Sequence, residues 1–146
     1  QAAQGVFEVI RASIAKKGGE AVKKGALAIA TVQGDIHDIG KNIVRLLLEN
    51  YGYEVSDLGR DVTPEAVCDE VIRLHAPLCG LSALMTTTVV HMEETIRQLR
   101  AAGWQGKVIV GGAVLTQTYA DQIGADFYSK DAMGAVRVAE RVFADQ

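Results

Sequence analysis

Residues 26–52 read ALAIATVQGDIHDIGKNIVRLLLENYG, and this stretch predicts a strand, a polar loop and a helix. The unbroken apolar run 26–32 is typical of a strand that is covered on both faces, as in a parallel sheet. Apolar residues then recur at helical spacing from Ile39 to Leu47, and Gly52 is a typical residue at a helix C-terminus. The stretch therefore predicts the first strand–helix unit of an α/β domain.

The same alternation of a short apolar run and a helical period occurs five times along the chain. Strands that alternate with helices indicate a parallel sheet with right-handed connections and helices on both faces. Five such strands favour a flavodoxin-like (Rossmann-like) fold with strand order 2-1-3-4-5. The predicted strands are 26–32, 53–58, 78–82, 107–110 and 126–128.

A length of 146 residues corresponds to one domain, and we expect that domain to span residues 25–146. Residues 1–24 carry an apolar stripe at helical spacing, followed by a Lys-Lys-Gly-Gly break. We interpret them as a helical stub, the remnant of an N-terminal helical cap region. Because the chain begins with Gln1 rather than Met, we expect it to be a piece of a longer protein.

Charge and apolar patterning exclude several classes of protein. There are 15 basic and 18 acidic residues, giving a net charge of −3, which argues against general binding to nucleic acid. We find no apolar run of the roughly 20 residues that a membrane span needs, and no signal peptide. The two cysteines, Cys68 and Cys79, are not in motif spacing and are interpreted as reduced, buried thiols. We therefore expect a cytoplasmic protein.

Four loops are expected to meet in one crevice, because ligands of such sheets bind at the carboxyl ends of the strands. They are the loops after the first, third, fourth and fifth strands, and the loop after the second is expected to lie to one side. These four loops hold the unusual chemistry of the chain. They read Gly34-Asp35-Ile36-His37-Asp38-Ile39-Gly40, Ser82-Ala83-Leu84-Met85-Thr86-Thr87-Thr88, Gly111-Gly112 and Tyr128-Ser129.

The first loop places one imidazole, His37, between the carboxylates of Asp35 and Asp38. A carboxylate beside an imidazole fixes its tautomer, as in an oriented base or metal ligand; a solvated polar loop is the alternative. A phosphate-binding loop is excluded, since five residues separate Gly34 from Gly40, and there is no G-x-G-x-x-G fingerprint. No second His or Cys stands at ligand spacing. A metal held inside a macrocycle would need only one protein ligand.

The other loops are less specific when taken alone. Gly111-Gly112 removes two Cβ atoms where a large ligand could approach, or forms a plain tight turn. Ser82 and the threonines that follow it are hydroxyl groups in the crevice, or ordinary helix-capping residues. The convergence of four separate loops is the stronger indication of a ligand site.

Asp35-x-His37-x-x-Gly40, Ser82-x-Leu84 and Gly111-Gly112, at these spacings, resemble the signature of corrinoid (vitamin B12, cobalamin) binding domains. The resemblance spans roughly residues 25–144. It is greatest to the methyltransferase branch, which includes the cobalamin domain of methionine synthase and the small corrinoid proteins of methanol, methylamine and methoxy-aromatic metabolism.

The resemblance implies a role for each matching residue. His37 would be the lower axial ligand to cobalt, in place of the cofactor's own base, and Asp35 and Thr88 would form a hydrogen-bonded relay behind it. Thr88 departs from the serine of methionine synthase but keeps a hydroxyl. Ser82 and Leu84 would line a slot for the displaced nucleotide tail. The cofactor-binding set is Gly34, Asp35, Ile36, His37, Asp38, Ile39, Gly40, Ser82, Leu84, Thr86, Thr88, Gly111, Gly112, Tyr128, Ser129 and Ala132.

The implied function is that of a methyl carrier rather than a stand-alone catalyst. Its cobalt would accept a methyl group from a substrate-specific methyltransferase. A second methyltransferase would then pass the group to tetrahydrofolate or a thiol, and a reductive-activation protein could be a further partner. Three alternatives remain open. They are the cobalamin-binding small subunit of an adenosylcobalamin-dependent mutase, a corrinoid sensor module, and a receiver or flavin-binding domain without cobalt.

Overall fold

The computed structural model describes residues 25–144 of the 146-residue chain. The segment 1–24, predicted to be a helical cap remnant, lies outside these residues and stays a prediction. The described part contains a five-stranded parallel sheet in the order β2-β1-β3-β4-β5, which confirms the predicted topology. The strands are β1 (Gly25–Thr31), β2 (Tyr53–Asp57), β3 (Leu78–Ser82), β4 (Lys107–Gly111) and β5 (Phe127–Tyr128).

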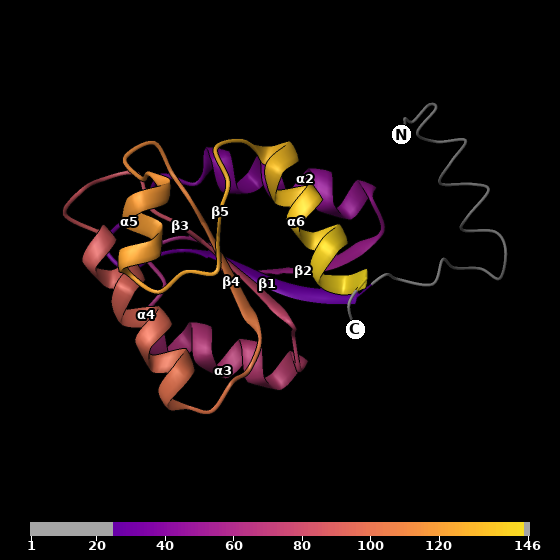
Figure 1. Cartoon of the computed structure of the whole chain (residues 1–146), viewed down its shortest axis with the longest axis horizontal. Helices are drawn as coiled ribbons and strands as arrows, with labels where there is room; N and C mark the ends of the chain where they lie inside the picture. Colours follow the sequence, from indigo (N-terminus) through magenta and orange to yellow (C-terminus); the bar gives the residue numbers. More distant parts are fainter. Residues whose placement is uncertain (1–24, 145–146) are drawn as a thin grey trace, which may run out of the picture.

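Helices cover both faces of this sheet (Figure 1). On one face α2 (Ile39–Asn50) packs beside α6 (Ala132–Ala144). On the other face α3 (Pro64–Leu74) packs beside α4 (Val89–Ala101), and α5 (Gln117–Gln122) adds to the same core. Two buried apolar clusters result, one on each side of the sheet, as expected for a parallel sheet that is covered twice.

Local sequence accounts for the ends of α3. The Thr63 hydroxyl accepts a hydrogen bond from the backbone N–H of Ala66, and Pro64 occupies the first helical position, where its missing N–H has no cost. The helix ends at Leu74, and the next residue, His75, adopts the left-handed conformation with φ of 55°. The predicted start of this helix at Thr63-Pro64 is therefore confirmed.

Helix α2 occurs where it is predicted, but three of its periodic apolar residues face outward. Ile39 is 77% exposed, and Ile43 and Leu46 are about half exposed. The face turned to the sheet includes Leu48 and, unexpectedly, Lys41, whose ammonium group donates to the Asp57 carboxylate at the end of β2. A charged residue is buried here because its partner is supplied by the neighbouring strand.

The carboxyl ends of the strands lie along one edge of the sheet, since all five strands are parallel. This edge carries the loops that follow β1, β3, β4 and β5, as the sequence predicts. Between residues 25 and 144, none of the helices has the length and apolar character needed to cross a membrane.

Candidate functional site

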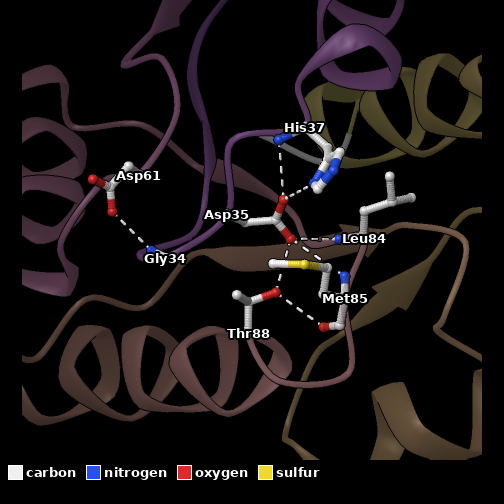
Figure 2. A network of polar contacts seen from close by, with 7 residues as sticks. All are labelled: Gly34, Asp35, His37, Asp61, Leu84, Met85 and Thr88. Atoms are coloured by element: carbon white, nitrogen blue, oxygen red, sulfur yellow. Dashed lines mark hydrogen bonds and ion pairs between the residues drawn. The ribbon is translucent and has the colours of Figure 1, made fainter.

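Asp35, in the loop between β1 and α2, is the centre of a polar network (Figure 2). Its side chain has 0% exposure. One carboxylate oxygen, Oδ1, accepts hydrogen bonds from the backbone N–H of His37 at 3.0 Å and from His37 Nδ1 at 2.7 Å. The carboxylate thus holds both the backbone and the ring of His37.

The second carboxylate oxygen, Oδ2, faces the loop after β3. It accepts hydrogen bonds from the backbone N–H groups of Leu84 at 2.7 Å and Met85 at 3.3 Å, and from the Thr88 hydroxyl at 2.8 Å. Leu84 and Thr88 are about fifty residues from Asp35 in the sequence. One buried carboxylate therefore joins two of the loops that the sequence predicts to meet.

These contacts decide the ionisation of Asp35. Burial alone would raise the pKa of the carboxyl group, but the hydrogen bonds from Leu84, His37 and Thr88 hold its pKa well below the ordinary value. Asp35 is consequently a carboxylate, and the proton in its bond with His37 belongs to Nδ1. That tautomer leaves a lone pair on Nε2.

The His37 ring is fixed on one side and open on the other. Its side chain is 45% exposed although its Nδ1 is bonded to a fully buried group. Among the described residues, none donates to or accepts from Nε2. The site therefore presents one imidazole nitrogen, in a defined tautomer and orientation, toward the outside of the sheet edge.

The loop after β2 also supports the site, so the prediction that it lies to one side is wrong. Asp61 Oδ1 accepts from the backbone N–H of Gly34 at 2.8 Å, and the Asp61 N–H donates to the Asp35 carbonyl at 2.9 Å. Asp61 has φ of 54°, a conformation that Asp tolerates better than most residues. Nothing in the spacing of the sequence marked Asp61 as part of the site.

Gly112 brings the loop after β4 against the loop after β3. A Cβ atom on Gly112 would lie 1.7 Å from the carbonyl oxygen of Ala83, and its φ is 145°. The N–H of Ala83 in turn donates to the carbonyl of Gly111. The second glycine of the pair is therefore required by the approach of two backbones, whatever else it contacts.

We predict that Gly112→Ala lowers the free energy of unfolding by about 3 kcal/mol, because both the clash and the positive φ must be relieved by moving backbone. Urea denaturation measures this directly. Gly111→Ala is the matched control, since its Cβ meets only the Ser129 carbonyl at 3.4 Å, and its cost should stay below about 1 kcal/mol. Equal effects of the two changes would contradict this account.

Several other predicted site residues lie around His37 without joining the network. The apolar side chains of Ile36, Ile39 and Leu84 are exposed, at 59%, 77% and 39%. The Asp38 side chain forms no cap hydrogen bond to α2. A Cβ on Gly40 would meet no atom of residues 25–144 within 4 Å, so packing among these residues gives no reason for glycine there. Exposed apolar groups and open space beside one imidazole suit the face of a large ligand.

The predicted residues near β5 are more dispersed. Tyr128 packs with the core on the side of α3 and α4 and donates to the carbonyl of Leu115 at 3.1 Å. It therefore lies on the opposite face of the sheet from Ser82 and Gly111. Ser82 points to the same face as Leu78, and Gly111 lies on the same face as Ile109, and both Leu78 and Ile109 belong to the core beside α2 and α6. The Ser129 hydroxyl donates to the Asp131 carbonyl, Ala132 begins α6, and Thr86 is exposed.

The donor set fits a metal that brings most of its ligands with it. Within residues 25–144 there is no group of three or more His, Cys, Asp or Glu that could hold a bare metal ion. A metal already bound in a macrocycle needs one further ligand, which Nε2 of His37 can supply. Fold and site together define a class of α/β domain that offers a single oriented imidazole at the carboxyl edge of its sheet.

The comparisons with known proteins identify the family. Residues 25–137 match the family described as the B12 binding domain. The chain belongs to this B12-binding family, and its cofactor is a corrinoid. The assignment agrees with the corrinoid-binding signature found in the sequence.

Similar relatives include proteins named as dimethylamine and trimethylamine corrinoid proteins. Dimethylamine corrinoid protein 3 of Methanosarcina mazei is 42% identical over 130 residues, which are 88% of this chain and 78% of that protein. Trimethylamine corrinoid protein 2 of Methanosarcina acetivorans is 42% identical over 132 residues, 89% of this chain and 61% of that protein. The chain spans about three fifths of the length of several of these relatives.

Solved structures agree with this assignment. The methanol:cobalamin methyltransferase complex of Methanosarcina barkeri matches with a TM-score of 0.86 and 33% identity, covering 99% of this chain and 56% of that one. A cobalamin-binding protein of Desulfitobacterium hafniense matches with a TM-score of 0.83 and 36% identity, covering 92% and 66%. A response regulator of Aurantimonas, at 17% identity and a TM-score of 0.59, shares the fold alone.

Proposed function

We propose that this domain is the methyl carrier of a corrinoid-dependent methyltransferase system. It receives a methyl group from a substrate-specific methyltransferase and delivers it to a second methyltransferase, whose acceptor is tetrahydrofolate or a thiol. The observation that carries the proposal is the single imidazole nitrogen, Nε2 of His37, which Asp35 holds in the tautomer a metal requires. The relatives named as dimethylamine and trimethylamine corrinoid proteins support it.

The bound corrinoid supplies cobalt, which can accept a methyl group and give it up again. The chain supplies the lower ligand and its control. His37 would bind the cobalt through Nε2, while Asp35 holds Nδ1–H and stabilises positive charge on the ring. The exposed side chains of Ile36, Ile39 and Leu84 would contact the ring system on the side of His37. Ser82, Gly111 and Ala132 would line the slot for the displaced nucleotide.

Thr88 gives the network a second arrangement of protons. Its hydroxyl lies 2.8 Å from Asp35 Oδ2 and 2.9 Å from the carbonyl of Met85, so it has two acceptors for one proton. If Asp35 takes up a proton, the Thr88 proton can turn to Met85 and the Thr88 oxygen can accept from Asp35. Asp35 and Thr88 can therefore reverse the direction of their hydrogen bond without moving the backbone.

The alternatives gain no specific support. A phosphate-accepting receiver domain requires an aspartate after the third strand, where this chain has Ser82. The dimethylamine and trimethylamine relatives at 42% identity are named as corrinoid proteins, and neither is named as a mutase subunit. The methyl carrier is thus the function that the site and the relatives support best.

Methyl transfer from the loaded domain tests the proposal. The protein would be reconstituted with methylcobalamin carrying a labelled methyl group and mixed with a thiol methyltransferase. We expect label to appear on the thiol faster than from free methylcobalamin, because the domain holds the ring in the presented orientation. Absence of any acceleration, together with radical rearrangement when adenosylcobalamin and a mutase large subunit are supplied, would overturn the proposal.

A further inference from the structure

The carboxyl end of β1 carries a buried hydroxyl that lacks a hydrogen bond. Thr31 has 0% exposure, and its Oγ1 has no partner among residues 25–144. Its backbone is fully engaged, because the N–H donates to the Gly59 carbonyl and the C=O accepts from Val62. A buried unpaired hydroxyl costs stability, and native proteins retain few of them without a reason.

The position of Thr31 relates this hydroxyl to the corrinoid site. In the register of the sheet, Thr31 pairs with Ser82 on β3, and Ser82 pairs with Gly111 on β4. Residues paired in this way point to the same face of a sheet. That face is the one covered by α2 and α6. Leu27 and Ile29, which point to the same face of β1 as Thr31, pack in the core on that side.

Thr31, Ser82 and Gly111 therefore form a row of two hydroxyl side chains and a glycine at the carboxyl ends of the strands. Ser82 is half-buried, whereas Thr31 lies one strand further toward β2 and is sealed. Asp57, the nearest acidic group on β2, is already occupied by Lys41, Arg45 and the N–H of Gly59. Among residues 25–144, Thr31 is thus a fully buried polar group on this face that still has capacity for a partner.

We infer that the Thr31 hydroxyl recognises the nucleotide part of the corrinoid by a hydrogen bond inside the domain. The inference rests on the proposed binding mode, in which His37 displaces the cofactor's own base and the nucleotide tail enters beside Ser82 and Gly111. Because Oγ1 is fully buried, the residues that cover it would have to move before the tail reaches it. A hydrogen bond to the nucleotide then gives the Thr31 hydroxyl the partner it lacks in the ligand-free protein. Thr31 therefore favours corrinoids that carry the nucleotide tail over those without it.

The test uses Thr31→Val, which keeps the shape and the β-branch but removes the hydroxyl. We expect two effects of opposite sign. The melting temperature of the ligand-free protein should rise by a few degrees, since an unpaired buried group is lost. The affinity for cobalamin should fall about 10-fold, while the affinity for cobinamide, which lacks the nucleotide, should not change.

Two further variants complete the experiment. Thr31→Ser keeps a hydroxyl and should retain the cobalamin preference. Thr95→Val is the matched control, because Thr95 is equally buried but its hydroxyl is bonded to the His91 carbonyl at 2.7 Å; it should lower the melting temperature and leave the preference intact. If Thr31→Val lowers the affinities for cobalamin and cobinamide equally, or lowers the melting temperature, the inference about Thr31 is overturned while the proposed function stands. A wild-type protein that binds neither corrinoid would overturn the proposed function with it.

Discussion

Replacing His37 with alanine should remove the protein ligand to cobalt and weaken corrinoid binding by about 100-fold, or about 2.7 kcal/mol. The size follows from the loss of a metal–ligand bond, since disturbing groups behind such a ligand already costs about 10- to 100-fold. The fold should survive, because the ring is 45% exposed and the backbone N–H of residue 37 still donates to Asp35.

Visible spectra of the protein reconstituted with methylcobalamin measure the ligation. The parent should show a cofactor whose own base is displaced and whose cobalt carries a protein nitrogen. The His37→Ala variant should show the displaced base without a protein ligand. His75→Asn is a suitable control, because it changes a histidine at the end of α3 and asparagine tolerates the left-handed conformation there. Identical spectra for the parent and His37→Ala would rule out His37 as the ligand.

The change Asp35→Asn should lower the free energy of unfolding by about 3 kcal/mol. Each oxygen of this carboxylate faces donors, two on the side of His37 and three on the side of Leu84. The amide nitrogen of asparagine is itself a donor, so either orientation leaves buried N–H groups facing one another. Asp38→Asn should change stability by less than about 0.5 kcal/mol, since that side chain makes no cap bond.

The same variant tests the pH dependence of stability. The pKa of Asp35 is lower in the folded protein than in the unfolded chain, where it is about 4. Its contribution to stability is therefore complete above the unfolded pKa and is lost as the pH falls below about 4 toward the folded pKa. Urea denaturation between about pH 6 and 3 should show a shallower loss in Asp35→Asn than in the wild type. If the free energy of unfolding falls equally with pH in both proteins, the pKa of Asp35 is not lowered by folding.

The sequence was sufficient to predict the sheet order and the pairing of Asp35 with His37. Both rest on short-range signals: the alternation of apolar runs with helical periods, and two polar residues separated by one position. Leu84 was predicted to line a slot for the nucleotide, and the structure shows a further contact of this residue. Its backbone N–H, rather than its side chain alone, meets the buried carboxylate.

Other features depend on contacts that leave no local signal. Lys41 is buried because Asp57 supplies a partner from the neighbouring strand, which the helical periodicity of α2 does not indicate. Asp61 supports the site through a backbone N–H and a side chain that accepts from Gly34. Thr31 looks like an ordinary strand residue, and its unpaired hydroxyl is seen only when the packing around it is known.

In the proposed binding mode, Nε2 of His37 binds cobalt in place of the cofactor's own base. Electron paramagnetic resonance of the protein loaded with cobalt(II) cobalamin tests it most directly, using protein grown with ¹⁵N-labelled histidine. Coordination by His37 predicts that the nitrogen splitting changes from a triplet to a doublet upon labelling, because the nuclear spin of the ligand atom changes. A triplet that persists in the labelled protein would show that the coordinating nitrogen does not belong to histidine, as when the cofactor's own base stays bound, and would rule out His37 as the ligand.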